Sequence, residues 1–291
     1  MVHQKSDFEL KSESISLLLD SGSNDVIVKN LFVSIDPYQL NRMKSQSSSQ
    51  IYSTLAAAIN PGEAIDAYGV AKVLVSGNPE FQKDDLVVGL ITWGDYSVIK
   101  PGGMLRKLDP MGFPLSHHVG ILGFSGLTAY AGFFEVCKPK KGEKVFVSAA
   151  SGSVGNLVGQ YFPDGIDIYF DNVGAEMQEA AIANMNVFGR VAVCGVISEY
   201  TDSGRKAAPD MIDIVYRRIK IQGFLATDFL NVYADFISTT CDHLRAGKMH
   251  TLEDISTGVE SIPSSLIGLF SGHNIGKKMV QLADSPIDIG V

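Results

Sequence analysis

Cysteine is scarce in this chain: Cys137, Cys194 and Cys241 stand far apart among 291 residues. An odd, widely spaced set provides neither a disulfide framework nor the ligand spacing of a zinc cluster. Free thiols of this kind are typical of a reducing compartment. We therefore expect a cytoplasmic protein without a structural metal.

Positive charge and long apolar runs are lacking as well. The formal net charge is −8 and no basic stripe is present, which argues against nucleic acid as the main partner. No apolar run reaches membrane-spanning length, and residues 1–14 lack the apolar core of a signal peptide, so we expect no membrane partner. With 45% hydrophobic and 19% charged residues, the chain can form two domains with real cores.

Short strands and turns dominate the first hundred residues. Residues 7–35 alternate in polarity around a turn at 21–24, which predicts two antiparallel strands. Residues 60–77 predict a turn and two strands, the first containing Tyr68, and residues 84–100 continue the β pattern. This succession is typical of a small, partly open barrel.

The pattern changes near Pro114. Residues 116–136 carry apolar side chains at helical spacing and predict one or two helices. Buried strands with intervening helices follow, which is typical of an α/β unit. The expected strands are 165–174, 189–198 and 214–226; the expected helices are 176–186 and 233–248; and 252–283 is expected to form a helix, a turn and a strand.

The segment from Lys144 to Gly159 has the pattern of a pyrophosphate-binding turn. A short apolar strand at 145–147 is followed by Gly152, Gly155 and Gly159, with apolar residues between the glycines. Backbone N–H groups at a helix start favour an anion, and glycine lets a phosphate approach closely. The sequence therefore predicts a dinucleotide site here, although a glycine-rich turn of another α/β unit has the same local pattern.

These motifs together resemble a family. They are DPY at 36–38, AYGVAK at 67–72, GLTAYAGFFEVC at 126–137, VFVSAASGSVG at 145–155, GIDIYFDNVG at 165–174, GRVAVCGVISEY at 189–200 and GLFSGHNIGK at 268–277. The chain resembles the plant NADPH-dependent alkenal and enone double-bond reductases, in the zinc-independent, leukotriene-B-dehydrogenase-like branch of the medium-chain dehydrogenase/reductases. The resemblance spans nearly the whole chain.

The resemblance implies an α/β fold of two domains and a homodimer using NADPH/NADP+. Residues 1–125 would form a partly open, GroES-like β-barrel catalytic domain. Residues 126–247 would form a doubly wound, Rossmann-type NADPH-binding domain, and residues 248–291 would return to the catalytic domain.

A complete dinucleotide fold needs more residues than this chain has. Only five residues, 160–164, separate the phosphate-turn helix from the strand at 165–174. Relative to the family, roughly 45 residues after Gln160 are lacking, where a second and third strand would lie. About ten to fifteen more are lacking between Gln4 and Ser6, by comparison with the same family. Either the molecule is truncated or the sequence omits residues that the molecule has. We favour omission, because removing half a parallel sheet would expose an edge and an apolar face.

Reduction of an α,β-unsaturated aldehyde or ketone is a conjugate hydride addition. Hydride from the nicotinamide reaches the β-carbon, and negative charge develops on the carbonyl oxygen, where a hydrogen-bond donor stabilises it. A proton then reaches the α-carbon from a side chain or water. Tyrosine suits the donor role because its hydroxyl is neutral. By motif the family's substrate-pocket tyrosines correspond to Tyr38, Tyr68 and Tyr200, each of which could instead be a half-buried structural residue.

The resemblance also implies the cofactor contacts, with Cys194 contributing backbone and packing rather than a nucleophile. These residues are Ser151, Gly152, Val154, Gly155, Asn172, Gly174, Cys194, Gly195, Ile197, Ser198, Phe224 and Asn274. We expect no metal, because His117 and His118 are adjacent and would face different ways on a helix.

Two other functions stay open. Related branches reduce quinones with the same cofactor turn, so a quinone reductase is one alternative to an enal or enone reductase. If the truncation is real, a catalytically silent binding protein with very weak NADPH affinity is the other.

Overall fold

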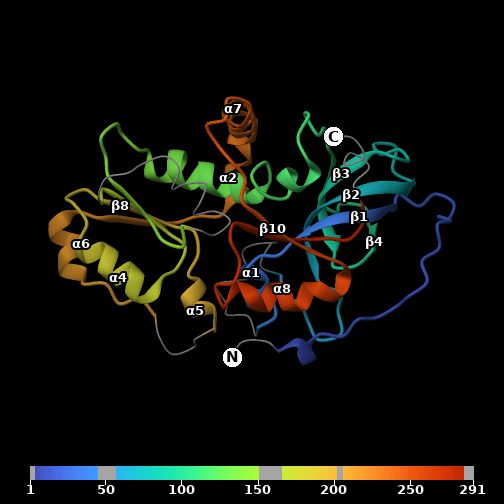
Figure 1. The fold of residues 1–291 in the computed structure, drawn as a ribbon, viewed down its shortest axis with the longest axis horizontal. Helices are drawn as coiled ribbons and strands as arrows, with labels where there is room; N and C mark the ends of the chain where they lie inside the picture. Colours follow the sequence, from blue (N-terminus) through green and yellow to red (C-terminus); the bar gives the residue numbers. More distant parts are fainter. Residues whose placement is uncertain (1–3, 45–56, 151–165, 202–205, 285–291) are drawn as a thin grey trace. The chain divides into compact units, whose positions relative to one another are not determined.

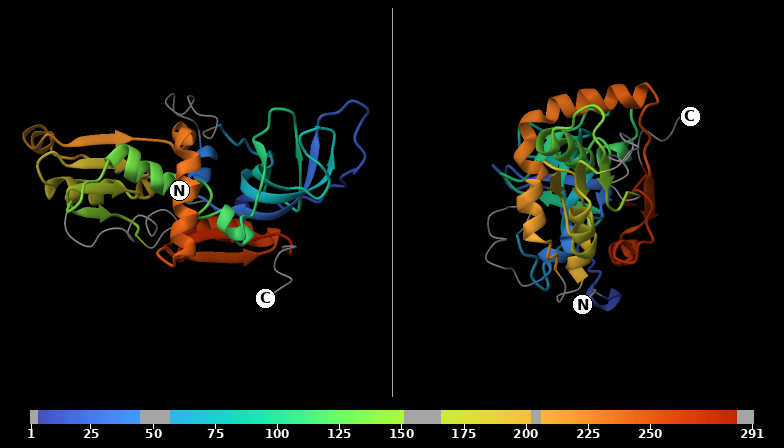
Figure 2. Two further views of the ribbon diagram at one scale, coloured as in Figure 1. Left: turned by 90° about the horizontal axis from the view of Figure 1, so that it is seen from above. Right: turned by 90° about the vertical axis from the view of Figure 1, so that its left-hand side faces the viewer.

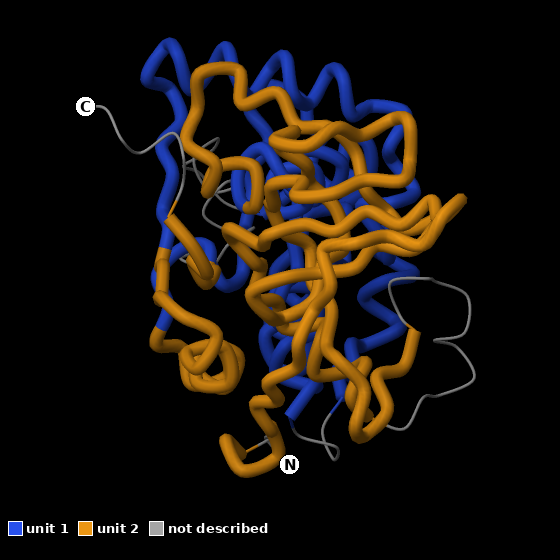
Figure 3. The backbone as a smooth tube through the Cα atoms, turned by 90° about the vertical axis from the view of Figure 1, so that its right-hand side faces the viewer, with its two compact units in different colours: residues 1–2, 120–253, 274–277 blue, residues 3–119, 254–273, 278–291 orange. Residues whose placement is uncertain are grey.

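The computed structural model describes residues 4–44, 57–150, 166–201 and 206–284 (Figure 1). The chain divides into two compact units, each built around one sheet (Figure 3). The first unit comprises residues 1–2, 120–253 and 274–277, and the second comprises 3–119, 254–273 and 278–291. The assignment of substrate and cofactor roles to separate domains stays a prediction.

The second unit contains a seven-stranded sheet. Its strands are β1 (Val26–Ser34), β2 (Asp66–Ser76), β3 (Leu86–Thr92), β4 (Tyr96–Ile99), β5 (Leu105–Lys107), β10 (Glu253–Thr257) and β11 (Lys277–Gln281). The order is β10-β11-β1-β2-β3-β5, with β4 paired to β1. One edge of β1 pairs with β2, while β4 and β11 share the other edge, so the sheet curves as a partly open barrel does.

Short helices accompany this sheet. They are η1 (Lys5–Asp7), α1 (Tyr38–Arg42), η4 (Leu115–His118), η7 (Val259–Ser261) and α8 (Ile262–Leu269). Ile262 and Leu266 of α8 are buried in the same core as Val28 and Val33 of β1. Burial of each such side chain contributes about 1.5–3 kcal/mol, which fixes α8 to the sheet.

The described residues of the first unit form a four-stranded parallel sheet in the order β6-β7-β8-β9. The strands are β6 (Val145–Val147), β7 (Ile168–Asp171), β8 (Arg190–Val193) and β9 (Lys220–Gly223). They run side by side in the left view of Figure 2, with β9 at one edge. All four residues of β7 are buried, as expected of a strand covered on both faces.

Helices cover both faces of this parallel sheet. The helices in the described residues of the first unit are α2 (Phe124–Tyr130), η5 (Ala131–Cys137), α4 (Ala175–Ala183), α5 (Ile197–Thr201), α6 (Met211–Arg217), η6 (Ala226–Val232) and α7 (Tyr233–Arg245). Tyr169 packs with Ala181 and Ile182 of α4, whereas Phe170 faces Gly132 of η5. Adjacent strand residues point to opposite faces, so α4 and η5 lie on opposite sides of β7.

The predicted two-domain α/β fold is confirmed, but the prediction of a strand before the turn at 21–24 is wrong. Residues 8–20 form no strand. Leu10, Leu17 and Leu18 are instead exposed, by 61%, 49% and 86%. Alternating polarity produces a strand only where a partner edge is available, and residues 8–20 pair with no strand in the described structure.

Three further differences concern element boundaries. The two strands expected within residues 60–77 are one continuous strand, β2. Residues 214–217, expected as strand, belong to helix α6, which begins after Asp210, whose side chain accepts a hydrogen bond from the Ile212 N–H at 2.8 Å. The tail has an unpredicted strand, β10, before helix α8.

None of the helices in the described part of the chain is long and apolar enough to cross a membrane.

Candidate active site

The carboxyl ends of the parallel strands gather several predicted cofactor residues at one edge of the first unit's sheet. Asn172 and Gly174 follow β7, while Cys194 and Gly195 follow β8. Ser148 follows β6. Ligands of open α/β sheets bind at this edge, because loops from neighbouring strands converge there.

Hydrogen bonds hold these strand ends in register. The backbone N–H and the side-chain amide of Asn172 donate to Oγ and to the carbonyl oxygen of Ser148, both at 2.9 Å. The N–H groups of Cys194 and Gly195 donate to the carbonyl oxygen of Asp171 at 2.9 and 3.2 Å. The ends of β6, β7 and β8 are thereby tied together through Asp171 and Asn172.

The loop after β8 is also bonded to the loop after β7. The N–H of Ile197 donates to the carbonyl oxygen of Asn172 at 3.2 Å, and the N–H of Ser198 donates to the carbonyl oxygen of Val173 at 3.1 Å. Oε1 of Glu199 accepts from the N–H of Ala175, also at 3.1 Å. Ile197 and Ser198, two of the predicted cofactor residues, therefore anchor one loop to the other.

Gly174 is required where these loops meet. Its φ is +75°, and a Cβ at this position would lie 2.7 Å from a methyl carbon of Val196. Both the left-handed backbone and the close approach favour glycine. The glycine predicted as a cofactor contact therefore has a structural role in bringing the loops together.

Tyr200 lies on α5 and turns its hydroxyl back toward the loop after β8. Its Oη accepts a hydrogen bond from the N–H of Val196 at 3.4 Å. A Cβ built on Gly195 would lie 3.3 Å from this oxygen and 3.8 Å from the carbonyl oxygen of Asn172. The hydroxyl of Tyr200 thus lies beside the predicted nicotinamide loop.

Cys194 has the properties of a packed thiol. Burial, assisted by the negative charge of Asp171, raises the pKa of Cys194 to about 12. A thiol with this pKa stays protonated at neutral pH and is a poor nucleophile. The contribution of Cys194 to a ligand would come from its backbone.

Of the remaining predicted cofactor residues, Phe224 follows β9 at the same edge of the sheet, and Asn274 lies in a separate segment. Phe224 packs its ring against Phe170, 6.1 Å between centroids, and so helps to form the core on the η5 side of the sheet. Asn274, in the first unit, donates from its amide to the carbonyl oxygen of Gly276 at 3.1 Å. Four residues of the phosphate turn lie outside the described part of the chain: Ser151, Gly152, Val154 and Gly155.

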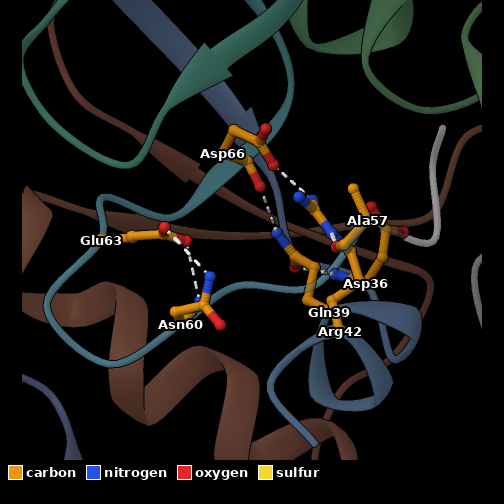
Figure 4. Close-up of polar contacts among 7 residues, drawn as sticks. All are labelled: Asp36, Gln39, Arg42, Ala57, Asn60, Glu63 and Asp66. Carbon is orange, nitrogen blue, oxygen red and sulfur yellow. Dashed lines mark hydrogen bonds and ion pairs between the residues drawn. The ribbon is translucent and has the colours of Figure 1, made fainter. Parts of the chain in front are cut away.

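Tyr38 and Tyr68 belong to the second unit. Tyr38 begins helix α1, and Tyr68 is a buried residue of β2. Asp66 lies two residues before Tyr68, so the two side chains point to the same face of β2. Arg42 of α1 forms an ion pair with Asp66 (Figure 4). The structure therefore brings α1 and this face of β2 together.

A polar network fixes helix α1 in place (Figure 4). The Nε of Arg42 donates to the carbonyl oxygen of Ala57 at 2.8 Å. Gln39 accepts from the N–H of Asp36 at 2.9 Å and donates to the carbonyl oxygen of Asp66 at 3.2 Å. Gln39 is fully buried, and the Arg42 side chain is only 8% exposed. Arg42 and Asp66 carry no motif signal of their own and were missed in the sequence.

The pKa of Tyr38 is raised well above its ordinary value. Burial is the largest cause, and the carboxylates of Asp36 and Asp66 add to it, whereas Arg42 acts in the opposite direction. The phenol is therefore neutral across the physiological range and retains its O–H as a hydrogen-bond donor.

No group of three or more histidine, cysteine, aspartate or glutamate side chains that could hold a metal occurs among the described residues. His118 bonds through Nε2 to the carbonyl oxygen of Pro110 at 3.1 Å, and His117 contacts the ring of Phe113. These histidines are packed within the second unit.

The curved antiparallel sheet of one unit and the parallel sheet of the other, with glycines after its strands, form a two-domain α/β architecture of the kind that binds nucleotides at its strand ends. Residues 2–108 match the family described as the N-terminal domain of oxidoreductase. The chain belongs to the zinc-independent medium-chain dehydrogenase/reductases, a family of NADP-dependent oxidoreductases that includes the alkenal reductases.

Two plant relatives and one crystal structure support this family assignment. A 2-alkenal reductase (NADP(+)-dependent) of Nicotiana tabacum is 43% identical, with 96% of this chain and 94% of the relative covered. A (+)-pulegone reductase of Mentha piperita is 38% identical over the same shares. The structure of CurA from Vibrio vulnificus in complex with NADPH has a TM-score of 0.83 at 27% identity, covering 95% of this chain and 94% of CurA.

The alignments with the tobacco and mint proteins extend over 326 and 328 positions, more than the 291 residues of this chain. Both relatives therefore have residues without a counterpart here.

Proposed function

We propose that this protein reduces the carbon–carbon double bond of α,β-unsaturated aldehydes or ketones with NADPH. The observation that carries the proposal is the hydroxyl of Tyr200, held beside Gly195 in the loop after β8. A neutral hydroxyl beside the predicted nicotinamide loop is suited to stabilise negative charge on a substrate carbonyl oxygen.

The strand-end cluster of the first unit fits the nicotinamide portion of the cofactor. Gly195 leaves open a space, between Tyr200 Oη and the carbonyl oxygen of Asn172, that a Cβ would fill. The side-chain oxygen of Asn172 and the carbonyl oxygens of Cys194 and Gly195 lie at the edge where such ligands bind, whereas the N–H groups of these residues are bonded within the protein. When bound, NADPH supplies the hydride that reaches the β-carbon of the substrate.

The protein's own residues have separate roles in this proposal. Asn172, Gly174, Gly195, Ile197 and Ser198 form the cofactor-side surface. The hydroxyl of Tyr200 donates a hydrogen bond to the substrate carbonyl oxygen, where negative charge develops as the β-carbon accepts hydride. Water or a side chain then protonates the α-carbon.

Tyr38 and Tyr68 are the candidate hydroxyls of the second unit. The raised pKa of Tyr38 keeps its phenol protonated, as hydrogen-bond donation requires. Asn274 and Phe224 stay candidates for cofactor contact, and a homodimer remains the expected assembly.

The decisive experiment measures NADPH oxidation against a matched panel of enals, enones and quinones. We expect turnover of enals or enones with loss of the C=C bond and retention of the carbonyl, identified by mass spectrometry and NMR. Turnover of quinones alone would establish the quinone reductase alternative. Absence of both turnover and measurable NADPH binding would instead favour a catalytically silent protein.

A further inference from the structure

Asp171 is a fully buried carboxylate at the end of β7, inside the strand-end cluster. Its Oδ1 accepts hydrogen bonds from the Tyr169 hydroxyl at 2.6 Å and from the N–H groups of Val173 and Gly174, both at 2.9 Å. The Ser148 hydroxyl adds a longer contact at 3.3 Å, and the Gln178 amide donates to Oδ2 at 2.8 Å. Every one of these groups can donate to a carboxylate.

The described residues place no cationic partner on this carboxylate. Arg190, on the neighbouring strand β8, pairs with Glu143 and also donates to the carbonyl oxygen of Cys137. Five neutral donors of the protein therefore surround the Asp171 carboxylate. Hydrogen bonds of this kind offset the cost of burying a charge, but they leave its net charge uncompensated.

The charge acts on the loop where nicotinamide is expected. The carbonyl oxygen of Asp171 accepts from the N–H groups of Cys194 and Gly195, so the two segments are adjacent. Asp171 also contributes, after burial, to the raised pKa of Cys194. An electrostatic effect of Asp171 thus reaches the end of the next strand.

Transfer of hydride from NADPH leaves one positive charge on the nicotinamide ring. A buried negative charge near that ring stabilises the oxidised form more than the neutral reduced form, because low dielectric screens the interaction weakly. We propose that Asp171 is a positioning residue that orients the loop after β7 and, through its charge, favours NADP+ over NADPH. This inference rests on the proposed cofactor site.

The first test replaces the charge by an isosteric neutral group, Asp171→Asn. The Oδ1 of asparagine can still accept from Tyr169, Val173 and Gly174, and Gln178 can rotate its amide to accept at the other side. Dissociation constants for NADP+ and NADPH are measured by calorimetric titration. We expect the ratio Kd(NADP+)/Kd(NADPH) to rise roughly fivefold to thirtyfold, the range for a unit charge acting through several ångströms of protein.

Tyr169→Phe is the matched control. It removes a hydrogen bond to the same carboxylate but retains the charge and the stacked contact with Phe146. It should lower the melting temperature while leaving the ratio within about twofold, because no net charge changes. If the role of Asp171 is purely structural, Asp171→Asn should weaken the binding of NADP+ and NADPH equally and leave the ratio of the two dissociation constants unchanged. That result would overturn the proposal.

A second pair of variants leaves all the hydrogen bonds to Asp171 Oδ1 in place. This pair is measured whether or not Asp171→Asn folds. Gln178→Lys places a cation where the amide now contacts Oδ2, and Gln178→Leu removes the amide without adding charge. Lysine should raise the ratio in the direction of Asp171→Asn, whereas leucine should leave it unchanged. An unchanged ratio in Gln178→Lys would contradict the proposal even if Asp171→Asn failed to fold.

Failure of this inference can be distinguished from failure of the proposed function. If the wild-type protein reduces enals but the ratio Kd(NADP+)/Kd(NADPH) is the same in Asp171→Asn and Gln178→Lys as in wild type, only the role of Asp171 is refuted. Wild-type protein that binds both cofactor forms and shows the expected shifts, but reduces no enal, refutes the proposed substrate class alone. Wild-type protein that binds neither cofactor form overturns both.

Discussion

Asn172 holds Ser148 by two hydrogen bonds that join the ends of strands β6 and β7. Its backbone N–H donates to Ser148 Oγ and its side-chain amide to the Ser148 carbonyl oxygen, each at 2.9 Å. The two residues are 24 positions apart in the chain. This pair sets the position of the Asn172 side chain at the proposed cofactor edge.

Replacing Ser148 with alanine should destabilise the protein and weaken NADPH binding. The Asn172 N–H would lose its acceptor, and an unsatisfied donor costs about 1–3 kcal/mol. Urea unfolding and calorimetric titration measure the two effects. Ser264→Ala, which removes an exposed hydroxyl, is the control and should change stability by less than about 0.5 kcal/mol. Unchanged stability in Ser148→Ala would show that the hydrogen bond from the Asn172 N–H to Ser148 Oγ is dispensable.

Tyr200→Phe should lower kcat by roughly tenfold to a hundredfold, less than the full loss of a well-preorganised donor, because another hydroxyl or water can partly substitute. The loss should fall on kcat rather than on KM, since the bond strengthens as charge develops. Steady-state kinetics on a small enal measure it, and the affinity for NADPH should change little.

Tyr216→Phe is the control for this substitution, because Tyr216 is 73% exposed on α6 and should tolerate loss of its hydroxyl. Full activity in Tyr200→Phe combined with a large loss in Tyr38→Phe would move the donor role to Tyr38. Full activity in both would exclude direct donation by either tyrosine.

The Arg42–Asp66 ion pair should contribute more than an ordinary surface pair. The Arg42 side chain is 8% exposed and that of Asp66 is 37% exposed, so solvent screens the pair only in part. A double-mutant cycle with Arg42→Met and Asp66→Asn should yield a coupling of about 1–2 kcal/mol. The same cycle at Lys72 and Asp84, 33% and 63% exposed, should give a clearly smaller coupling, because solvent screens an exposed pair. Equal couplings would contradict this ranking.

His118 should reduce stability at acidic pH. Burial lowers the pKa of His118 from 6.5 to about 4. The nearby His117 and Arg106 act in the same direction, whereas the hydrogen bond to Pro110 and the charge of Asp109 oppose the shift. The unfolded state therefore takes up the proton first. The stability that neutral His118 contributes is fully present above pH 6.5 and is lost as the pH falls toward 4.

The measurement for His118 is the free energy of unfolding from pH 7.5 to 4. His118→Gln retains an N–H donor and does not titrate, so its stability should fall by about 1–3 kcal/mol less over this range. His273→Gln, at an exposed position, is the control and should follow the wild-type curve. Parallel curves for His118→Gln and wild type would contradict the assignment.

Intact-mass measurement tests the missing strands of the dinucleotide fold. The sequence corresponds to 31.3 kDa, and we expect a mass several kDa higher, because removing half of a parallel sheet would leave an edge and an apolar face exposed. In that case NADPH should be strongly preferred over NADH in kcat/KM. A mass of 31.3 kDa would establish the truncation, and the preference for NADPH should then be small.

Local patterns were sufficient to predict much of the parallel sheet. The apolar run at 145–147 and the predicted strand at 165–174, with the glycines that follow or end them, predicted β6 and β7, because buried parallel strands have a simple hydrophobic signal. The alternation at residues 8–20 was misleading, since a strand also requires a partner that local sequence does not reveal. Strand β10 was missed for the complementary reason, because its five residues are stabilised by pairing within the sheet.

The sequence by itself determined the family, the α/β class and the tyrosines and glycines that carry the family motifs, because such motifs are contiguous. Only the tertiary structure revealed that Asp171 is solvated by five donors, that Arg42 pairs with Asp66, and that the Tyr200 hydroxyl lies beside Gly195. Ser148 reaches Asp171 across strands, and Arg42 reaches Asp66 across 24 positions of chain. Such contacts depend on strand register and loop geometry, which arise from packing of the whole unit rather than from the spacing of neighbouring residues.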